Sequence, residues 1–281
     1  RNNPKSKVSR GIARFTNIAN IKTNTKLSSH LLTGTRFLAQ IVPRSGVGTT
    51  SAKNGYSVSI SGNYAIVGAP DRIISSNKTG AAYILNLDAT KWSQASNPLI
   101  LTASDGQADD QFGFSVGISG NRAIAGAYAE DAGGSSAGAA YVYSLREGSW
   151  QQDAKLVADN AGTNDSFGFS VAISGDTAVI GAYQEDTKAS NAGAVYVFTY
   201  SDGSWSQTTM LTASDGGFSD GFGRAVDISG NTIVVGSYSD DDSVSNSGAA
   251  YVFTLSGGTW SQTQKLKASD PGSVDNYGLS V

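Results

Sequence analysis

Alternating apolar and polar positions predict that the chain consists of short β-strands joined by tight turns. Between Gly168 and Phe222, stretches with the two-residue period of half-buried strands alternate with glycine-containing turns. One stretch is rich in aromatic and β-branched residues, which favour strands, and the unit contains no helical period. The predicted strands of this unit are 169–173, 177–183, 193–199 and 205–211.

The same four-strand unit recurs at a constant interval of about 55 residues, and such regular self-similarity is typical of repeat architectures. Its marker is the glycine of a Phe-Gly or Tyr-Gly pair, found at Gly113, Gly168, Gly223 and Gly278, and Gly55 precedes the first of them by a slightly longer interval. A tyrosine follows each glycine from Gly55 to Gly223 at one constant spacing, at Tyr83, Tyr141, Tyr196 and Tyr251. A tryptophan follows at a second constant spacing, at Trp92, Trp150, Trp205 and Trp260.

Four short antiparallel strands per repeat predict the blade of a β-propeller, here partial or truncated. A β-sandwich is the competing all-β fold, but it does not require tyrosine and tryptophan at the same place in every repeat. The first repeat has three extra residues between Trp92 and Leu101, around Asn97 and Pro98. A proline at this point predicts a bulge on an outer strand.

Charge divides the chain into two parts. Residues 1–54 contain ten Lys and Arg and no acids, whereas residues 55–281 contain the other ten basic residues and all 23 acids. We expect 1–34 to be a basic segment outside the fold: a targeting segment, a flexible arm or unrelated upstream sequence. Within 35–54, residues 36–42 resemble the last strand of a preceding blade. The predicted blades are 55–112, 113–167, 168–222 and 223–277, and 278–281 begins another, so we expect the chain to be a fragment.

Composition excludes several classes of site. The acidic repeats argue against a nucleic-acid surface, which needs a basic stripe. The absence of cysteine excludes disulfides and thiolate zinc sites. No run of about 18 apolar residues is present, so no membrane-spanning segment is expected.

The repeat resembles the FG-GAP repeat, named after its Phe-Gly and Gly-Ala-Pro segments. The string FGFSVAISGD at 167–176 and VIGAY at 179–183 carry the resemblance, and GAP itself stands at 68–70. The pattern is most similar to the bacterial form, which continues with segments such as GAAYVF at 248–253 and WSQ at 260–262. The resemblance covers residues 55–281. It implies an integrin-α-like propeller from a secreted or surface protein that binds other proteins or matrix, and a calcium loop in many members.

Two acidic loops recur in the repeats. The loop before Phe-Gly contains Asp105, Asp109, Asp110, Asp159, Asp165, Asp215, Asp220, Asp270 and Asp275. The loop after Gly-Ala or Gly-Ser contains Glu130, Asp131, Glu185, Asp186, Asp240, Asp241 and Asp242, and the first repeat has Asp71-Arg72-Ile73 there. These carboxylates are either ligands for Ca²⁺, which takes six to eight oxygens, or caps of turns that accept backbone N–H groups. None of the loops has the alternate-residue spacing with which one loop encloses an ion.

The periodic aromatic residues also have two interpretations. They form either a sugar-stacking platform or the packing between neighbouring blades, and their identical positions in each repeat favour packing. The only histidine, His30, lies in the basic segment, so the repeats cannot hold a Ser-His-Asp set. Enzymes with this fold place out-of-register groups in the central channel, and we find no such residue in the second to fourth repeats.

The sequence therefore predicts a non-catalytic binding or adhesion module that presents loops to a protein or glycan, outside the cell or on its surface. Two alternatives remain. One is a structural spacer within a surface protein, and the other is a propeller glycosidase or lyase that uses paired carboxylates. Further blades or domains of the parent protein are expected partners.

Overall fold

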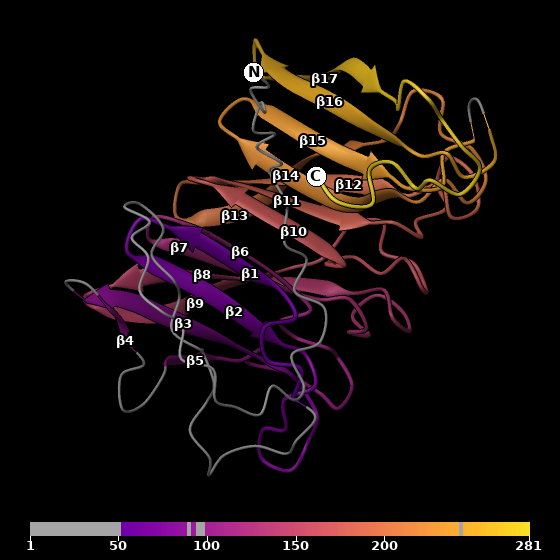
Figure 1. Ribbon diagram of the computed structural model, residues 1–281. Coiled ribbons are helices and arrows are strands. Elements are labelled where there is room, and N and C mark those ends of the chain that lie inside the picture. Colours follow the sequence, from indigo (N-terminus) through magenta and orange to yellow (C-terminus); the bar gives the residue numbers. More distant parts are fainter. Residues whose placement is uncertain (1–51, 89–90, 94–98, 242–243) are drawn as a thin grey trace, which may run out of the picture. The chain divides into compact units, whose positions relative to one another are not determined.

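The strands form four antiparallel sheets, one for each repeat, in a computed structural model that describes residues 52–88, 91–93, 99–241 and 244–281 (Figure 1). Among these residues, no helix is long and apolar enough to cross a membrane. Several sequence predictions lie outside the described residues: the segment 1–34, the strand at 36–42, His30, Asn97, Pro98, Asp242 and the side chain of Trp92.

Each sheet is one blade of a β-propeller, and its strands pair in chain order. Blade 1 contains β1 (Val58–Ser61), β2 (Tyr64–Ala69), β3 (Ala81–Asp88), β4 (Lys91–Ser93) and β5 (Leu99–Leu101). Blade 2 contains β6 (Ser115–Ser119), β7 (Arg122–Ala127), β8 (Ala139–Arg146) and β9 (Ser149–Leu156). Blade 3 contains β10 (Ser170–Ser174), β11 (Thr177–Ala182), β12 (Ala194–Ser201) and β13 (Ser204–Leu211). Blade 4 contains β14 (Phe222–Ser229), β15 (Thr232–Ser237), β16 (Ala249–Ser256) and β17 (Thr259–Leu266). The predicted propeller fold is confirmed.

The outer strand of blade 1 is divided into two pieces. In the other blades, the pairing of the third and fourth strands shifts register once, after Val142, Val197 or Val252. In blade 1, β3 pairs with β5 as far as Ile84 and with β4 from Asn86 onward. The three extra residues of the first repeat therefore fall where the other blades have a β-bulge, a place that tolerates an unpaired residue.

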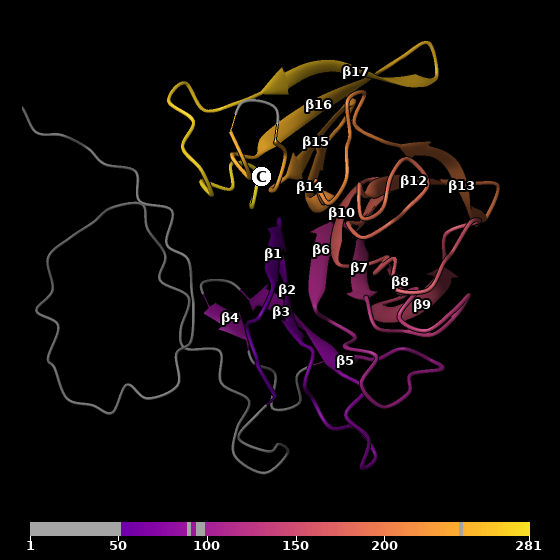
Figure 2. The same cartoon turned by 90° about the vertical axis from the view of Figure 1, so that its right-hand side faces the viewer.

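The hydrophobic core lies between blades. The first strands β1, β6, β10 and β14 are neighbours in this order (Figure 2), and the second strands pack on them. Along β11, Ala178 and Ile180 pack in a cluster with Ile124 of blade 2, whereas Val179 packs in a cluster with Ile228 of blade 4. Because successive side chains of a strand point to opposite faces, each inner sheet is buried on both sides.

The Phe-Gly pair joins one blade to the next. Phe112, Phe167 and Phe222 are completely buried. The N–H of Phe167 donates to the carbonyl of Ala137 in blade 2, with an N–O distance of 2.8 Å. This backbone bond fixes the start of each blade against the loop of the preceding one, and the N–H groups of the other two phenylalanines make equivalent bonds.

Candidate functional site

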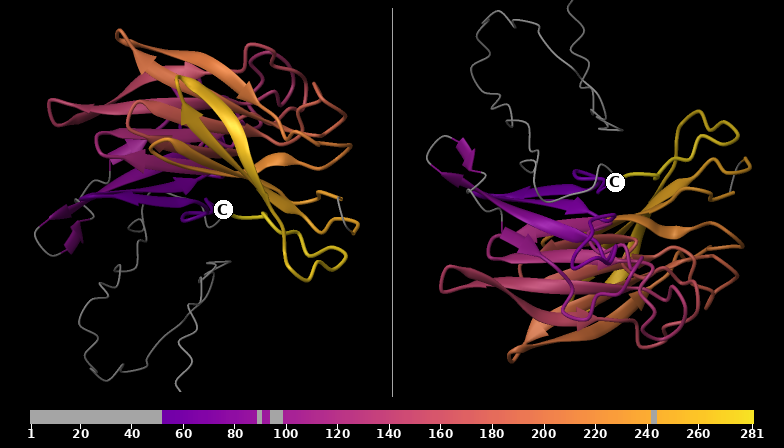
Figure 3. Two further views of the ribbon diagram at one scale, coloured as in Figure 1. Left: turned by 90° about the horizontal axis from the view of Figure 1, so that it is seen from above. Right: turned by 90° about the horizontal axis from the view of Figure 1, so that it is seen from below.

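All predicted acidic residues that the structure describes lie at one end of the strands, which we call the loop end. The turns between first and second strands and between third and fourth strands lie at the opposite end, and the longer loops lie at the loop end (Figure 3). These longer loops either connect the second strand to the third or connect one blade to the next. The loop end therefore collects the polar chemistry of the repeat.

In blade 2, a lysine holds two of the predicted acids together. The Nζ of Lys155 donates to Asp105 at 2.6 Å and to Glu130 at 2.8 Å. The hydroxyl of Tyr141 donates to the other carboxylate oxygen of Asp105 at 2.8 Å. The four side chains form a cluster that connects both acidic loops through a strand residue of the blade.

The ion pairs set the protonation of this cluster. Burial alone would raise the pKa of Asp105, but the hydrogen bonds from Lys155 and Tyr141 outweigh it and hold the pKa below its usual value. Burial, reinforced by the neighbouring Asp105 carboxylate, raises the pKa of Tyr141. Burial would lower the pKa of Lys155, yet its two carboxylate partners raise it. At neutral pH Asp105 is therefore a carboxylate, Lys155 an ammonium group and Tyr141 a neutral phenol.

Blade 4 repeats the cluster. The Nζ of Lys265 donates to Asp215 at 2.7 Å and to Asp240 at 2.9 Å. The hydroxyl of Tyr251 donates to Asp215 at 2.8 Å and to Asp240 at 2.6 Å. Sequence analysis did not identify either lysine, although both stand at the same distance along the chain from the marker glycine of their repeat.

Blade 3 replaces the ion pairs with a neutral arrangement. Met210 stands at the position of the lysine, and Asn160 stands at the position of Asp105 and Asp215. The amide of Asn160 accepts from Tyr196 at 2.9 Å and donates to Glu185 at 3.1 Å, and Oε2 of the buried Glu185 has no hydrogen-bond partner among the described residues. The sequence prediction grouped Asp159 with Asp105 and Asp215, but the true equivalent in blade 3 is the next residue, Asn160. Asp159 is exposed, and its backbone N–H donates to a glutamine of blade 3.

Most of the other predicted acids brace their own loops. One set accepts the backbone N–H of the residue three positions earlier: Asp110, Asp165, Asp220 and Asp275. A second set accepts the N–H of the residue five positions later: Asp131, Asp186 and Asp241. Asp109 lies 3.5 Å from the ammonium group of Lys78, and Asp270 is exposed. Burial raises the pKa of Asp110, Asp165 and Asp220 although each accepts a backbone N–H.

These residues do not fit a calcium site. In the described part of the chain, no group of three or more His, Asp or Glu side chains is placed to hold a metal ion. Calcium is coordinated by six to eight oxygens at the same time. The carboxylates of blades 2 and 4 converge on lysine ammonium groups instead. The remaining loop carboxylates mostly face backbone N–H groups of their own turns.

The periodic tyrosines lie in the core, and Trp150, Trp205 and Trp260 are partly buried and pack against it. Tyr141, Tyr196 and Tyr251 are completely buried, and Tyr83 is nearly so. Trp150 meets Tyr64 of blade 1 edge-on at 5.6 Å, and the ring of Trp205 lies 5.3 Å from the guanidinium of Arg122 in blade 2. Trp260 packs on the core between blades 3 and 4. A side chain at Gly113, Gly168, Gly223 or Gly278 would overlap a backbone carbonyl of the preceding blade.

A second set of aromatic rings lies where first strands begin and second strands end. Phe114 contacts Tyr56 at 4.7 Å, Tyr128 at 4.5 Å and Phe169 at 4.7 Å, and Phe169 contacts Tyr183 at 4.5 Å. We call these five residues the aromatic ladder. It extends across three blades, and all of its rings are partly exposed or exposed. The ladder was not predicted from the sequence, because its members immediately follow the more obvious Phe-Gly and Gly-Ala signals.

Arg224 continues the ladder in blade 4. It stands where the other blades have Tyr56, Phe114 and Phe169, and its guanidinium lies 4.2 Å from the centre of the Phe169 ring. The guanidinium is also 5.6 Å from the ring of Tyr183. We expected no out-of-register residue lining the central channel in the second to fourth repeats. Arg224 is out of register, because it replaces an aromatic residue at this position.

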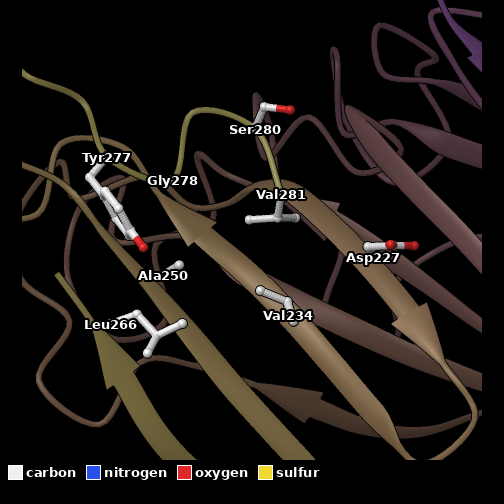
Figure 4. A pocket seen from close by; sticks show the side chains of 8 residues that line it. All are labelled: Asp227, Val234, Ala250, Leu266, Tyr277, Gly278, Ser280 and Val281. Carbon is white, nitrogen blue, oxygen red and sulfur yellow. The ribbon is translucent and has the colours of Figure 1, made fainter. Parts of the chain in front are cut away.

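A hollow of about 400 Å³ lies on the open face of blade 4 (Figure 4). Its apolar lining includes Val234, Ala250 and Leu266, and Tyr277 and Val281 lie over the same sheet. The equivalent residues of blade 3 are buried against the first strand of blade 4. The hollow is therefore the packing face that every blade offers to the next, and we do not assign a ligand to it.

Asp215 is expected to make stability depend on pH. Burial would raise its pKa, but hydrogen bonds from Lys265 and Tyr251 lower it below the usual value of 3.8. Stabilisation by the ionised group is therefore complete at neutral pH and is lost as pH falls through the lowered pKa. In thermal unfolding, Asp215→Asn should lower the Tm at pH 7, and the difference from the parent chain should vanish at strongly acidic pH.

Asp270 provides the matched control for this experiment. It occupies the same repeat position as Asp215, but it is exposed and has no hydrogen bond or ion pair with the described residues. Asp270→Asn should leave the Tm unchanged at every pH. A Tm difference for Asp215→Asn that persists undiminished at low pH would contradict the ionic explanation.

The repeat is also recognised by comparison with known proteins. The sequence model of the FG-GAP repeat matches four times, at residues 44–85, 92–143, 150–198 and 205–253. No curated protein matches the chain. Among solved structures, the N-terminal domain of Nup159 is similar at 14% sequence identity and a TM-score of 0.40, over 74% of this chain and 47% of that one. The four family matches cover well over half of the sequence and include most of the strands, the three Phe-Gly pairs and the buried tyrosines described above, so the chain belongs to the FG-GAP repeat family.

Proposed function

We propose that the chain is a non-catalytic binding module of a secreted or surface-attached protein, and that its ligand, a protein or a glycan, binds at the aromatic ladder. FG-GAP repeats are typical of extracellular and surface proteins, which supports this location. The rigid blades hold the ligand-contacting residues at strand ends, so little ordering is needed when the ligand binds.

The partial exposure of the ladder carries this proposal. Its contiguous rings lie at the loop end, whereas the periodic tyrosines are completely or almost completely buried. The hydroxyl groups of Tyr128 and Tyr183 make no hydrogen bond within the described residues. Aromatic rings with unsatisfied hydroxyls provide flat apolar contact and polar groups together, a combination enriched at binding surfaces.

The lysine clusters support a non-catalytic role. A glycosidase needs one carboxyl group as an acid and a second as a nucleophile or base. Asp105 and Glu130, and likewise Asp215 and Asp240, each converge on one lysine instead. The hydrogen bonds from the lysine and the tyrosine hold the pKa of Asp105 and of Asp215 below its usual value, which hinders the action of either group as a general acid.

The test is a binding screen against matrix proteins and glycans, followed by substitution of the ladder. The double variant Tyr128→Ala, Tyr183→Ala should weaken binding of any hit about tenfold or more, because each stacked ring contributes on the order of 1 kcal/mol. Phe218→Ala is the control: Phe218 is 73% exposed and makes no ring contact in the described structure. Uniformly negative screens would instead favour a structural spacer.

A further inference from the structure

Arg224 gives the ladder a specific chemistry. We propose that the end of the ladder around Arg224 binds the carboxylate of an acidic sugar, such as a uronic acid unit of a polysaccharide. This inference rests on the proposed function, because it specifies the ligand class of the same surface.

The guanidinium of Arg224 is held in place by aromatic rings. It lies 4.2 Å from the centre of the Phe169 ring, 5.6 Å from that of Tyr183 and 5.7 Å from that of Tyr238. Arginine on an aromatic face is attracted by the ring quadrupole, and its planar group is well suited to such stacking. The ring contacts orient the guanidinium without using its N–H donors, which remain available to a ligand.

No carboxylate neutralises this guanidinium within the described residues. The acids nearest in sequence, Asp220 and Asp227, accept the backbone N–H groups of Gly217 and Ile228, and Asp240 pairs with Lys265. A contrast is provided by Arg122, which also stacks on an aromatic ring, Tyr200, at 3.9 Å.

Arg122 differs from Arg224 because it is paired with carboxylates. Its guanidinium contacts Asp153 at 3.5 Å and Asp176 at 2.7 Å, so it clamps blade 2 to blade 3. A guanidinium with five donors forms its strongest contacts with carboxylates in a two-pronged geometry. Arg224 has ring support like that of Arg122 but lacks the carboxylate among the described residues, and a ligand can supply it.

The surroundings of Arg224 suit a sugar ring. Tyr183 and Tyr238 are half-buried, and their hydroxyls make no hydrogen bond within the described residues. A pyranose ring that stacks on these aromatic faces can direct its carboxylate to the guanidinium and its hydroxyls to the phenols. The repeats carry a large excess of acids, so a densely charged polyanion is repelled, and a sugar chain with isolated carboxylates fits better.

The experiment compares a uronic acid oligosaccharide with its carboxyl-reduced form, which has the same rings without the charge. The parent chain should bind the acidic form about tenfold more tightly or better, since hydrogen bonds to charged groups are among the strongest. Arg224→Phe restores the aromatic residue of the other blades. This variant should bind the acidic and the reduced oligosaccharide equally well, because only the contact with the carboxylate is lost. Arg224→Lys should keep part of the preference for the acidic form.

The outcomes separate this inference from the proposed function. Equal binding of both sugars by the parent chain would overturn the carboxylate site and leave the ladder as a binding surface. Binding of acidic peptides with no binding of sugars would also overturn it. A parent chain that binds neither sugar and no protein would remove both proposals. Unchanged thermal unfolding of Arg224→Phe verifies that a lost preference does not result from misfolding.

Discussion

Replacing Gly126 by alanine is expected to lower the free energy of unfolding by about 3 kcal/mol or more, within the upper range for overpacked cores. A Cβ on Gly126 of β7 would overlap the backbone carbonyl of Gly168, which begins blade 3. The same carbonyl accepts a hydrogen bond from the hydroxyl of Ser115 at 2.7 Å. Gly126 is fixed by strand pairing, and the N–H of Gly168 is hydrogen-bonded to the carbonyl of Gly181, so relief requires the two blades to separate. Urea unfolding of the parent and variant chains measures the loss.

Gly106→Ala is the control for this prediction. A Cβ at Gly106 would meet only ordinary van der Waals neighbours, the nearest at 3.4 Å. Its effect should stay within about 0.5 kcal/mol, as for most surface substitutions. If both variants unfold at the same urea concentration, close approach of backbones is not what joins blades 2 and 3.

Replacing Lys155 by methionine is the second large effect, with an expected loss of about 3 kcal/mol. The substitution leaves Glu130, whose side chain is only 6% exposed, without the ammonium group that pairs with it. It also leaves the side chains of Asp105 and Glu130 close together without a positive charge between them. Chemical unfolding at neutral pH measures the loss, and Lys265→Met in blade 4 should reproduce it.

Blade 3 suggests how this damage can be repaired. It has Asn160 and Met210 where blade 2 has Asp105 and Lys155, so the double variant Asp105→Asn, Lys155→Met copies its arrangement. The asparagine amide can donate to Glu130 as Asn160 donates to Glu185 at 3.1 Å. The double variant should therefore be more stable than Lys155→Met alone. Additive losses in this double-mutant cycle would show that the two residues do not act as a unit.

The repeat period made most of the fold predictable. The four strands of each unit follow from alternating apolar and polar positions. The extra residues of the first repeat follow from the spacing of recurring residues, such as the marker glycines. These features are local, because turn chemistry and strand period depend on residues a few positions apart. The exact bounds shifted by one or two residues, as for β12, which begins at Ala194 and extends to Ser201.

The polar clusters were less predictable because their members are distant in sequence. Asp105 and Lys155 are 50 residues apart, and each lies in an ordinary acidic loop or amphipathic strand. The sequence shows that loop carboxylates recur, but it does not show which oxygen faces an ammonium group and which faces a backbone N–H. The repeat alignment does mark Arg224, because it replaces the aromatic residue of the other repeats, but the rings that surround it belong to Phe169, Tyr183 and Tyr238, which are distant or unremarkable in sequence.

The equivalence of the blade interfaces also affects how such chains can change in evolution. The first strands of blades 2 and 3 present Val116 and Ile118, or Val171 and Ile173, to the blade before them. A recombination event that removed residues 113–167 would join Phe112 to Gly168 and recreate a Phe-Gly pair. Blade 1 would then meet the same valine and isoleucine from a different repeat. Gain or loss of whole repeats by unequal crossing-over therefore preserves the Phe-Gly junction and this apolar packing between blades, whereas an insertion out of phase disrupts both.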